Sequence, residues 1–106
     1  MPQTCLELVV YTVRNAEDAA RARRAAMPHI RAMPGFLSWR AVRDSSGSAT
    51  FADLAEWESL DHARAAAEAF AREEAFADFR AAIDGLVHMG HFETDALVTA
   101  SQDVTA

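Results

Sequence analysis

Two strand-like runs in the middle of the sequence leave few folds open to this chain. Residues 36–43 and 49–57 are rich in aromatic and β-branched side chains, and the link between them, Asp44-Ser45-Ser46-Gly47-Ser48, consists of turn-forming residues. This pattern predicts an antiparallel hairpin, in which pairing Arg43 with Ala49 places Trp39 opposite Asp53. That register separates two sheet faces. The first carries Leu37, Trp39, Ala41, Phe51, Asp53, Ala55 and Trp57, and the second carries Phe36, Ser38, Arg40, Val42, Thr50, Ala52, Leu54 and Glu56.

An amphipathic helix is predicted before the hairpin. Asn15 can cap its start through the side-chain oxygen, and small or apolar residues recur at helical spacing as far as Pro34-Gly35. Pro28 lies inside this pattern and lacks a backbone N–H, so we expect a kink or a short break there.

A second helical region is predicted after the hairpin. Ser59 can cap its start, and aromatic residues continue the helical spacing to a predicted stop at Gly85. An irregularity is expected near Arg72-Glu73.

The ends of the chain supply two further strands, at residues 5–13 and 86–94. The resulting order of strand, helix, strand, strand, helix, strand predicts an α+β domain of the ferredoxin-like kind. In this fold, a four-stranded antiparallel sheet carries both helices on one face. We expect one such domain over residues 1–98 and a short tail over residues 99–106.

The composition predicts a thin core and a partner subunit. Of the 106 residues, 51% are hydrophobic, but 24 are Ala and only 22 are Leu, Ile, Val or Phe. The single Cys5 cannot form a disulfide within the chain. The uncovered sheet face would expose Phe36, Val42, Ala52 and Leu54, which is more apolar surface than a monomer usually shows. We therefore expect a homodimer that pairs through this open sheet face.

Charge and hydropathy limit the partners and the location. The net charge of −6 disfavours nucleic-acid binding. No apolar run is long enough to cross a bilayer and no signal peptide is recognisable, so the prediction is a cytoplasmic protein without a membrane partner. A basic stretch comprises Arg21, Arg23, Arg24 and Arg31. We interpret it as a solvated helix face paired with an acidic neighbour rather than as an anion site.

Asp53 is the most informative polar residue, because a carboxylate in the middle of a central strand costs desolvation unless it is paired. It could act as a base toward a phenolic substrate, or it could simply bond an Arg or a backbone amide. His88 and His91 are alternative proton carriers on the last strand. Their spacing puts them on opposite sheet faces, so no metal site is predicted.

Four aromatic residues are candidates for the wall of a small-molecule pocket, although each could be plain core: Trp39, Phe51, Trp57 and Phe79. The chain has no glycine-rich phosphate loop, nucleophile elbow or metal-spaced Cys/His cluster. We therefore expect no cofactor.

Two segments carry a family resemblance. Met33-Pro34-Gly35-Phe36-Leu37-Ser38-Trp39 opens the second strand, and Glu56-Trp57-Glu58-Ser59 closes the third before an Ala-rich helix. Over residues 5–94 the chain resembles the antibiotic biosynthesis monooxygenase family of dimeric α+β barrels. The resemblance implies a pocket between the sheet and the helices of each subunit. Activities in such families include cofactor-independent oxidation of polycyclic aromatics, haem degradation and isomerisation.

The haem-degrading branch does not fit this sequence. That branch uses an Asn in the first strand, a Trp in the second helical region and a haem-ligating His further along it. This chain has no Asn in residues 5–13, no Trp after Trp57, and Arg80 about where the His would fall. The leading hypothesis is a cofactor-independent monooxygenase for a small aromatic or polyketide-like molecule. The alternative is a dimer of the same fold that binds a small ligand, or has a stress-associated role, without catalysis.

Overall fold

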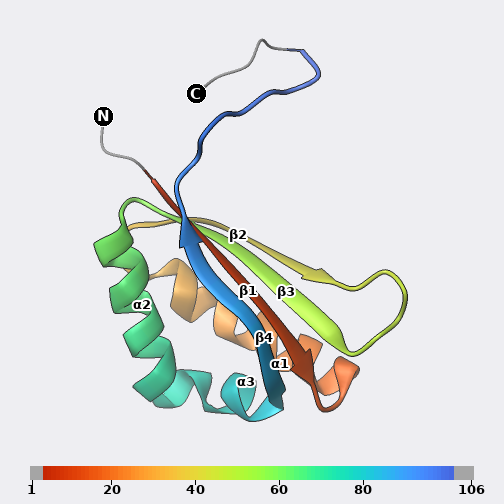
Figure 1. Ribbon diagram of the computed structural model, residues 1–106. Helices are drawn as coiled ribbons and strands as arrows, with labels where there is room; N and C mark the ends of the chain where they lie inside the picture. Colours follow the sequence, from red (N-terminus) through yellow and green to blue (C-terminus); the bar gives the residue numbers. More distant parts are fainter. Residues whose placement is uncertain (1–3, 102–106) are drawn as a thin grey trace.

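The computed structural model describes residues 4–101. Figure 1 shows the chain order of its elements, whose bounds are β1 (Cys5–Val13), α1 (Ala16–Arg31), β2 (Phe36–Arg43), β3 (Thr50–Trp57), α2 (Leu60–Arg72), the 3₁₀ turn η1 (Glu74–Phe76), α3 (Ala77–Ala82) and β4 (Ile83–Phe92). The strands form one antiparallel sheet in the order β2-β3-β1-β4. The predicted ferredoxin-like α+β architecture is therefore confirmed.

The helices all pack on one face of the sheet. Alternate residues of β1 and β3 turn toward them, and the buried core gathers there around four large side chains: Trp57, Tyr11, Phe51 and Phe76. The buried residues of the helices are mostly Ala, including Ala19, Ala26 and Ala63. Because these side chains are small, the helix backbones lie close to the sheet. The core is as thin as the composition predicted.

The hairpin forms, but its register differs from the prediction by two residues. Arg43 pairs with Phe51 rather than with Ala49, and Trp39 pairs with Ala55 rather than with Asp53. Because side chains alternate with a period of two, a shift of two leaves most residues on their predicted faces. Asp53 and Trp39 thus still share the face that the helices cover.

A bulge at the start of β2 reverses the positions of two residues. The pairing skips Leu37, so that Phe36 lies opposite Trp57 and their rings meet edge to face with centroids 5.6 Å apart. Phe36 was predicted on the open face and instead packs against the core, while Leu37, predicted on the covered face, is 45% exposed. Both assignments were wrong for this one local reason.

Capping side chains set the helix starts as predicted. The side-chain oxygen of Asn15 accepts a hydrogen bond from the backbone N–H of Asp18 at 2.9 Å, and Ser59 does the same for His62 at 3.1 Å. Helix α1 runs through Pro28 to Arg31 without a break. Of the kink or short break expected at Pro28, the break is therefore absent.

The second helical region bends where an irregularity was predicted. Helix α2 ends at Arg72, and the guanidinium of Arg80 in α3 reaches back to the carbonyls of Phe70 and Glu73 at 2.6 and 2.7 Å. The helix does not continue to Gly85 as predicted. Helix α3 ends at Ala82, because Ile83 is the first residue of β4 and pairs with Val13 of β1. Gly85 is a strand residue opposite Thr12.

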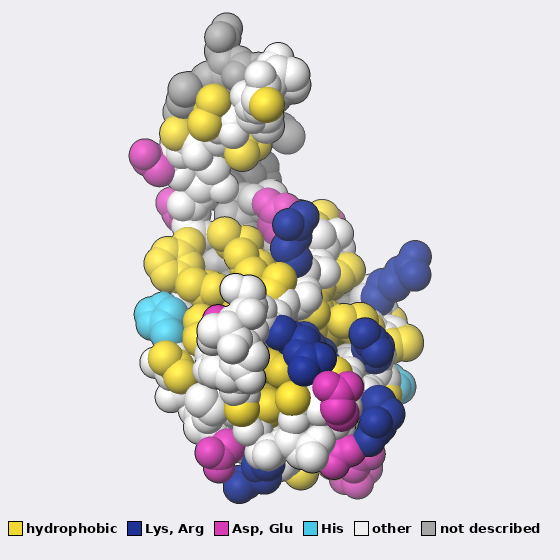
Figure 2. Space-filling model, turned by 90° about the vertical axis from the view of Figure 1, so that its right-hand side faces the viewer, with side chains coloured by type: hydrophobic (Ala, Val, Ile, Leu, Met, Phe, Trp, Pro, Cys, Tyr) yellow, Lys and Arg dark blue, Asp and Glu magenta, His cyan; other side chains and the backbone are white. Residues whose placement is uncertain are grey.

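No described helix covers the other face of the sheet, which we call the open face. Its central strands bring Leu8 opposite Leu54 and Val10 opposite Ala52, and Phe92 lies opposite Leu6 at one side. Beyond β4 the chain projects from the body, and Figure 2 shows hydrophobic side chains on this projecting segment. Two of them, Leu97 and Val98, are 55% and 63% exposed.

None of the helices in residues 4–101 is both long and apolar enough to span a membrane. The predicted tail, residues 99–106, falls largely outside the described residues.

Two glycines with similar backbone conformations allow a matched stability test. Gly35 and Gly47 have φ values of +80° and +88°, where an L side chain is strained by about 1–2 kcal/mol. At Gly35 a Cβ would also overlap the His62 ring, whereas at Gly47 it meets open space. Urea unfolding at one protein concentration should show that Gly35→Ala costs roughly 1–3 kcal/mol more than Gly47→Ala. Equal losses would contradict the packing of His62 against this turn.

Candidate functional site

A cavity of about 400 Å³ lies between the covered face of the sheet and the helices. Its floor comes from β1, β2, β3 and β4, and its roof comes mainly from α2 and α3. The lining residues are Glu7, Val9, Tyr11, Ile30, Trp39, Asp53, Ala55, Trp57, Ala66, Ala67, Phe70, Phe79, Ile83, Leu86 and Met89. Apolar and aromatic side chains dominate this set, which also includes two carboxylates, Glu7 and Asp53.

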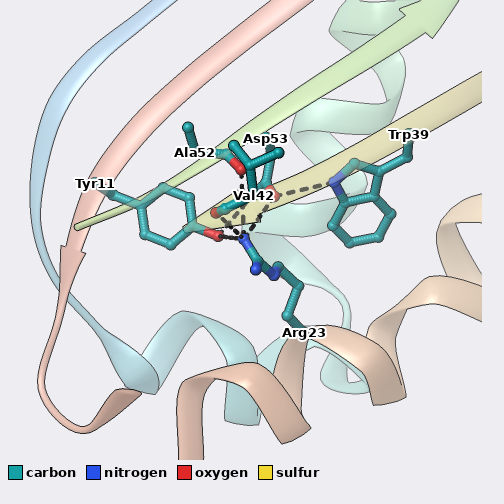
Figure 3. A network of polar contacts seen from close by, with 6 residues as sticks. All are labelled: Tyr11, Arg23, Trp39, Val42, Ala52 and Asp53. Carbon is teal, nitrogen blue, oxygen red and sulfur yellow. Dashed lines mark hydrogen bonds and ion pairs between the residues drawn. The ribbon is translucent and has the colours of Figure 1, made fainter. Parts of the chain in front are cut away.

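Asp53 lies in the middle of β3, between Val9 of β1 and Ala41 of β2. Figure 3 shows its carboxylate as the centre of a polar network. The hydroxyl of Tyr11 donates to Oδ2 at 2.7 Å, and the indole N–H of Trp39 donates to Oδ1 at 3.0 Å. Both donors belong to neighbouring strands, so the network crosses three strands of the sheet.

Arg23 completes the network from the helix side of the sheet. It extends from α1, and its Nη1 lies 3.1 Å from Asp53 Oδ1 and 3.2 Å from the carbonyl oxygen of Val42 (Figure 3). The guanidinium also lies over the ring of Phe51, with Cζ 4.4 Å from the ring centroid. Only 5% of Arg23 is exposed. The prediction that Arg23 belongs to a solvated helix face was therefore wrong, although it does pair with an acid.

Burial shifts the pKa values of two groups in this network. Burial raises the pKa of the Asp53 carboxyl, and the hydrogen bonds from Tyr11 and Trp39 and the charge of Arg23 offset this effect only in part. Burial and the Asp53 carboxylate together hold the pKa of Tyr11 well above its usual range. The Tyr11 hydroxyl therefore keeps its proton at neutral pH and remains a donor.

A second polar pair lies on the cavity floor. Glu7 of β1 points to the helix side, and its Oε2 lies 2.9 Å from Nε2 of His91, its direct partner on β4. The side chains of Glu7 and His91 are 14% and 21% exposed. An ionised carboxylate can only accept hydrogen bonds, so an ionised Glu7 pairs with the His91 tautomer that bears its hydrogen on Nε2.

The two predicted histidines occupy different environments. His91 contacts Glu7, which lines the cavity. His88 pairs with Val10 on the open face, and its ring centroid lies 6.2 Å from that of Phe92. The structure therefore does not bring His88 together with Asp53. Within residues 4–101, no three His, Cys, Asp or Glu side chains come together as potential metal ligands.

Three of the four predicted aromatic residues line the cavity, namely Trp39, Trp57 and Phe79. Trp39 stacks on Phe79 with ring centroids 6.5 Å apart and planes 25° apart. Phe51 is fully buried beneath Arg23 and does not line the cavity. The indole N–H of Trp57 is buried without a hydrogen-bond acceptor among the described residues.

Sequence reasoning missed Glu7 and Arg23 as site residues, yet both carried a signal. Glu7 is the one charge in the apolar run of residues 5–13 and has the same parity as Val9 and Tyr11. Arg23 follows Ala19 by four residues and precedes Ala26 by three, which places it on the buried stripe of α1. In each case a charged residue interrupts an otherwise apolar pattern.

The buried ion pair predicts unequal costs for the same substitution at two sites. Asp53→Asn leaves Arg23 buried without a counter-charge and should cost roughly 3–5 kcal/mol of unfolding free energy. Asp84→Asn removes the partner of Arg14 in an exposed pair and should cost at most about 1 kcal/mol.

The free energy of unfolding is measured by urea unfolding of the two Asn variants and of a double variant that combines Arg23→Met with Asp53→Leu. Removing both charges should recover part of the loss, because no buried charge is left unpaired, although Tyr11 and Trp39 then lack their acceptor. Equal losses of unfolding free energy in the two Asn variants would show that the buried pair of Arg23 and Asp53 stabilises the fold no more than an exposed pair does.

The chain is similar to known proteins both in sequence and in fold. Residues 9–82 match the family described as antibiotic biosynthesis monooxygenase. Among proteins of curated function, none matches this sequence.

Solved structures match over most of the chain. SnoaB from Streptomyces nogalater, described as a cofactor-independent oxygenase, is 17% identical with a TM-score of 0.68, and the match covers 94% of this chain and 99% of that one. A protein from Bordetella bronchiseptica with the same family description is 12% identical with a TM-score of 0.75, covering 87% and 97%. Another from Chloroflexus aurantiacus is 16% identical with a TM-score of 0.69, covering 86% and 92%.

At these identities the structural likeness shows the fold, while the sequence match spans more than half of the chain. The resemblance found in the sequence is thereby confirmed, and the chain belongs to the antibiotic biosynthesis monooxygenase family.

Proposed function

We propose that the protein is a cofactor-independent monooxygenase that binds a flat, mostly apolar aromatic molecule in the 400 Å³ cavity. The main observation in favour of this function is the cavity, because its volume lies within the range of small-molecule sites. Its few polar groups are carboxylates and hydrogen-bond donors of the kind that handle protons. The family and the fold shared with an oxygenase support the same reaction class.

The aromatic lining favours a planar ligand. Phe70 and Phe79 meet edge to face with ring centroids 5.4 Å apart, and Trp39 stacks on Phe79. A flat ring system can add to such a cluster by offset stacking or by edge contacts. Ala66 and Ala67 in the roof leave room for it, because their side chains are small.

The reaction uses a protein base and dioxygen. For an anthrone, the base removes a proton from the ring methylene, and the resulting enolate passes one electron to dioxygen. The radical and superoxide join in a carbon–oxygen bond, and the peroxide takes up the proton. Loss of the second methylene proton breaks the oxygen–oxygen bond, so that a quinone carbonyl and one water molecule form. One oxygen atom of dioxygen enters the product and the other enters the water.

The proposed working form is a cytosolic homodimer joined through the open face. Leu8 and Leu54 face each other there, and no described helix covers them. The thin monomer core supports this assembly, because a second sheet would bury further apolar surface. The buried free thiol of Cys5 is compatible with a reducing compartment.

Oxygen consumption with anthrone tests the activity. The wild-type protein should consume one dioxygen per anthrone and form anthraquinone without hydrogen peroxide. Ala67→Trp fills the cavity and should abolish turnover, whereas Ala65→Trp, on an exposed position of the same helix, should not. If anthrone binds in the cavity without any oxygen uptake, the non-catalytic binding protein becomes the better reading.

A charged residue on the open face tests the assembly. Leu54→Arg buries a charge against Leu8 and should convert the dimer to monomer or aggregate, as measured by light scattering at micromolar concentration. Leu60→Arg serves as the control, because this exposed residue lies at the start of α2, away from the open face. A stable wild-type monomer, or a dimer that persists with Leu54→Arg, would contradict the open-face interface.

A further inference from the structure

We propose that Glu7, held in position by His91, is the base that removes the substrate proton in this cavity. The inference rests on the proposed function for its substrate class and adds the residue that performs the first step. Asp53 then serves as a positioning residue of the cavity floor.

The hydrogen bonds of Asp53 argue against its acting as the base. Its Oδ1 accepts from Arg23 and Trp39, and its Oδ2 accepts from Tyr11 at 2.7 Å. Each oxygen is engaged by a donor, and one donor carries a full positive charge 3.1 Å away. Accepting a substrate proton would break up this network and leave Arg23 buried without a counter-charge.

Glu7 has an acceptor oxygen available. Its Oε2 bonds His91, and among the described residues no hydrogen bond engages its Oε1. The side chain is 14% exposed and lines the cavity. A ligand in the cavity could therefore meet a carboxylate oxygen that no protein donor occupies.

The sheet register places Glu7 at the centre of the floor. Trp39 pairs with Ala55, Ala55 with Glu7, and Glu7 with His91, so these residues form one row across all four strands. The small Ala55 separates the Trp39 indole from the Glu7 carboxylate. A flat ring lying over Ala55 would contact the indole on one side and present its edge to Glu7 on the other.

His91 has the role of a positioning residue. With its hydrogen on Nε2, the His91 ring donates to Oε2 at 2.9 Å, which holds one carboxylate oxygen and leaves Oε1 without a donor among the described residues. A cross-strand pair of this kind contributes roughly 0.2–1 kcal/mol to sheet stability, so its structural value is small. A carboxylate at this half-buried position therefore adds little to stability through its contact with His91, whereas proton abstraction requires one.

The proposed step is a proton transfer that needs no oxidant. The carbon–hydrogen bond of the anthrone methylene breaks, its electron pair passes into the enolate, and the proton binds to a Glu7 oxygen. Return of a proton from Glu7 regenerates the anthrone. In heavy water without oxygen, this reversible step exchanges the methylene hydrogens for deuterium.

The test is therefore deuterium exchange into anthrone under nitrogen, followed by mass spectrometry and corrected for exchange without protein. The wild type should accelerate exchange, and Glu7→Gln should lose about a hundred- to ten-thousand-fold of that rate, as expected for removal of a general base. The amide keeps the size of the side chain and an acceptor for His91. Glu58→Gln is the matched control at an exposed position and should exchange at the wild-type rate.

Anthrone affinity, measured by quenching of Trp fluorescence, separates chemistry from folding. Glu7→Gln should bind anthrone within about threefold of wild type, because the removed interaction acts on the proton. His91→Gln retains a donor and should keep more exchange activity than His91→Leu, with similar affinity.

Each outcome decides the inference. Wild-type exchange that disappears in Glu7→Gln supports it, even if oxygen uptake fails and the monooxygenase proposal falls. Absence of wild-type exchange, or full exchange by Glu7→Gln, overturns it, and oxygen uptake that persists in Glu7→Gln would then leave the monooxygenase proposal standing with another base.

Discussion

The ion pair between Arg23 and Asp53 is the interaction on which the rest of the site depends. It joins α1 to β3, and the same two side chains bond Tyr11 of β1, Trp39 of β2 and the carbonyl of Val42. Isolated charges at this depth would be unfavourable by several kcal/mol each. The network meets that cost with hydrogen bonds from fixed partners, and it thereby fixes the Trp39 ring that forms one cavity wall.

The sparse core gives this network its structural importance. Helices α1 and α2 contribute mainly Ala, whose small side chains bring the helices near the sheet but supply little apolar area of their own. The aromatic residues of η1 and α3, Phe76 and Phe79, fill part of the remaining space, and the cavity occupies the rest. A structure that leaves such a space unfilled gives up stability, which is common at functional sites.

Local sequence signals predicted most of the fold because they act over a few residues. The caps at Asn15 and Ser59 and the turn around Gly47 determine their elements without help from distant parts of the chain. The errors arose where distant contacts decide. The bulge at Leu37 follows from the packing of Phe36 on Trp57, and Ile83 continues the helical spacing but pairs with Val13.

The candidate site was predictable only where a local sequence signal marked a residue. Asp53 was detectable because a carboxylate in a central strand is anomalous by itself, and Trp39 followed from its parity in the hairpin. Arg23 was assigned to a solvated face with its basic neighbours, although its spacing from Ala19 and Ala26 puts it on the buried stripe of α1. Glu7 stands out as the one charge in the apolar run of residues 5–13, but its contact with His91, 84 residues away, depends on the pairing of β1 with β4.

We propose that side chains of this cavity let an aromatic substrate react directly with dioxygen. The most direct measurement is the mass of the anthraquinone formed under isotopically labelled dioxygen by protein treated with a strong metal chelator. Direct reaction with dioxygen should place one labelled oxygen atom in each product molecule. A product without label, or loss of activity after chelation, would contradict it.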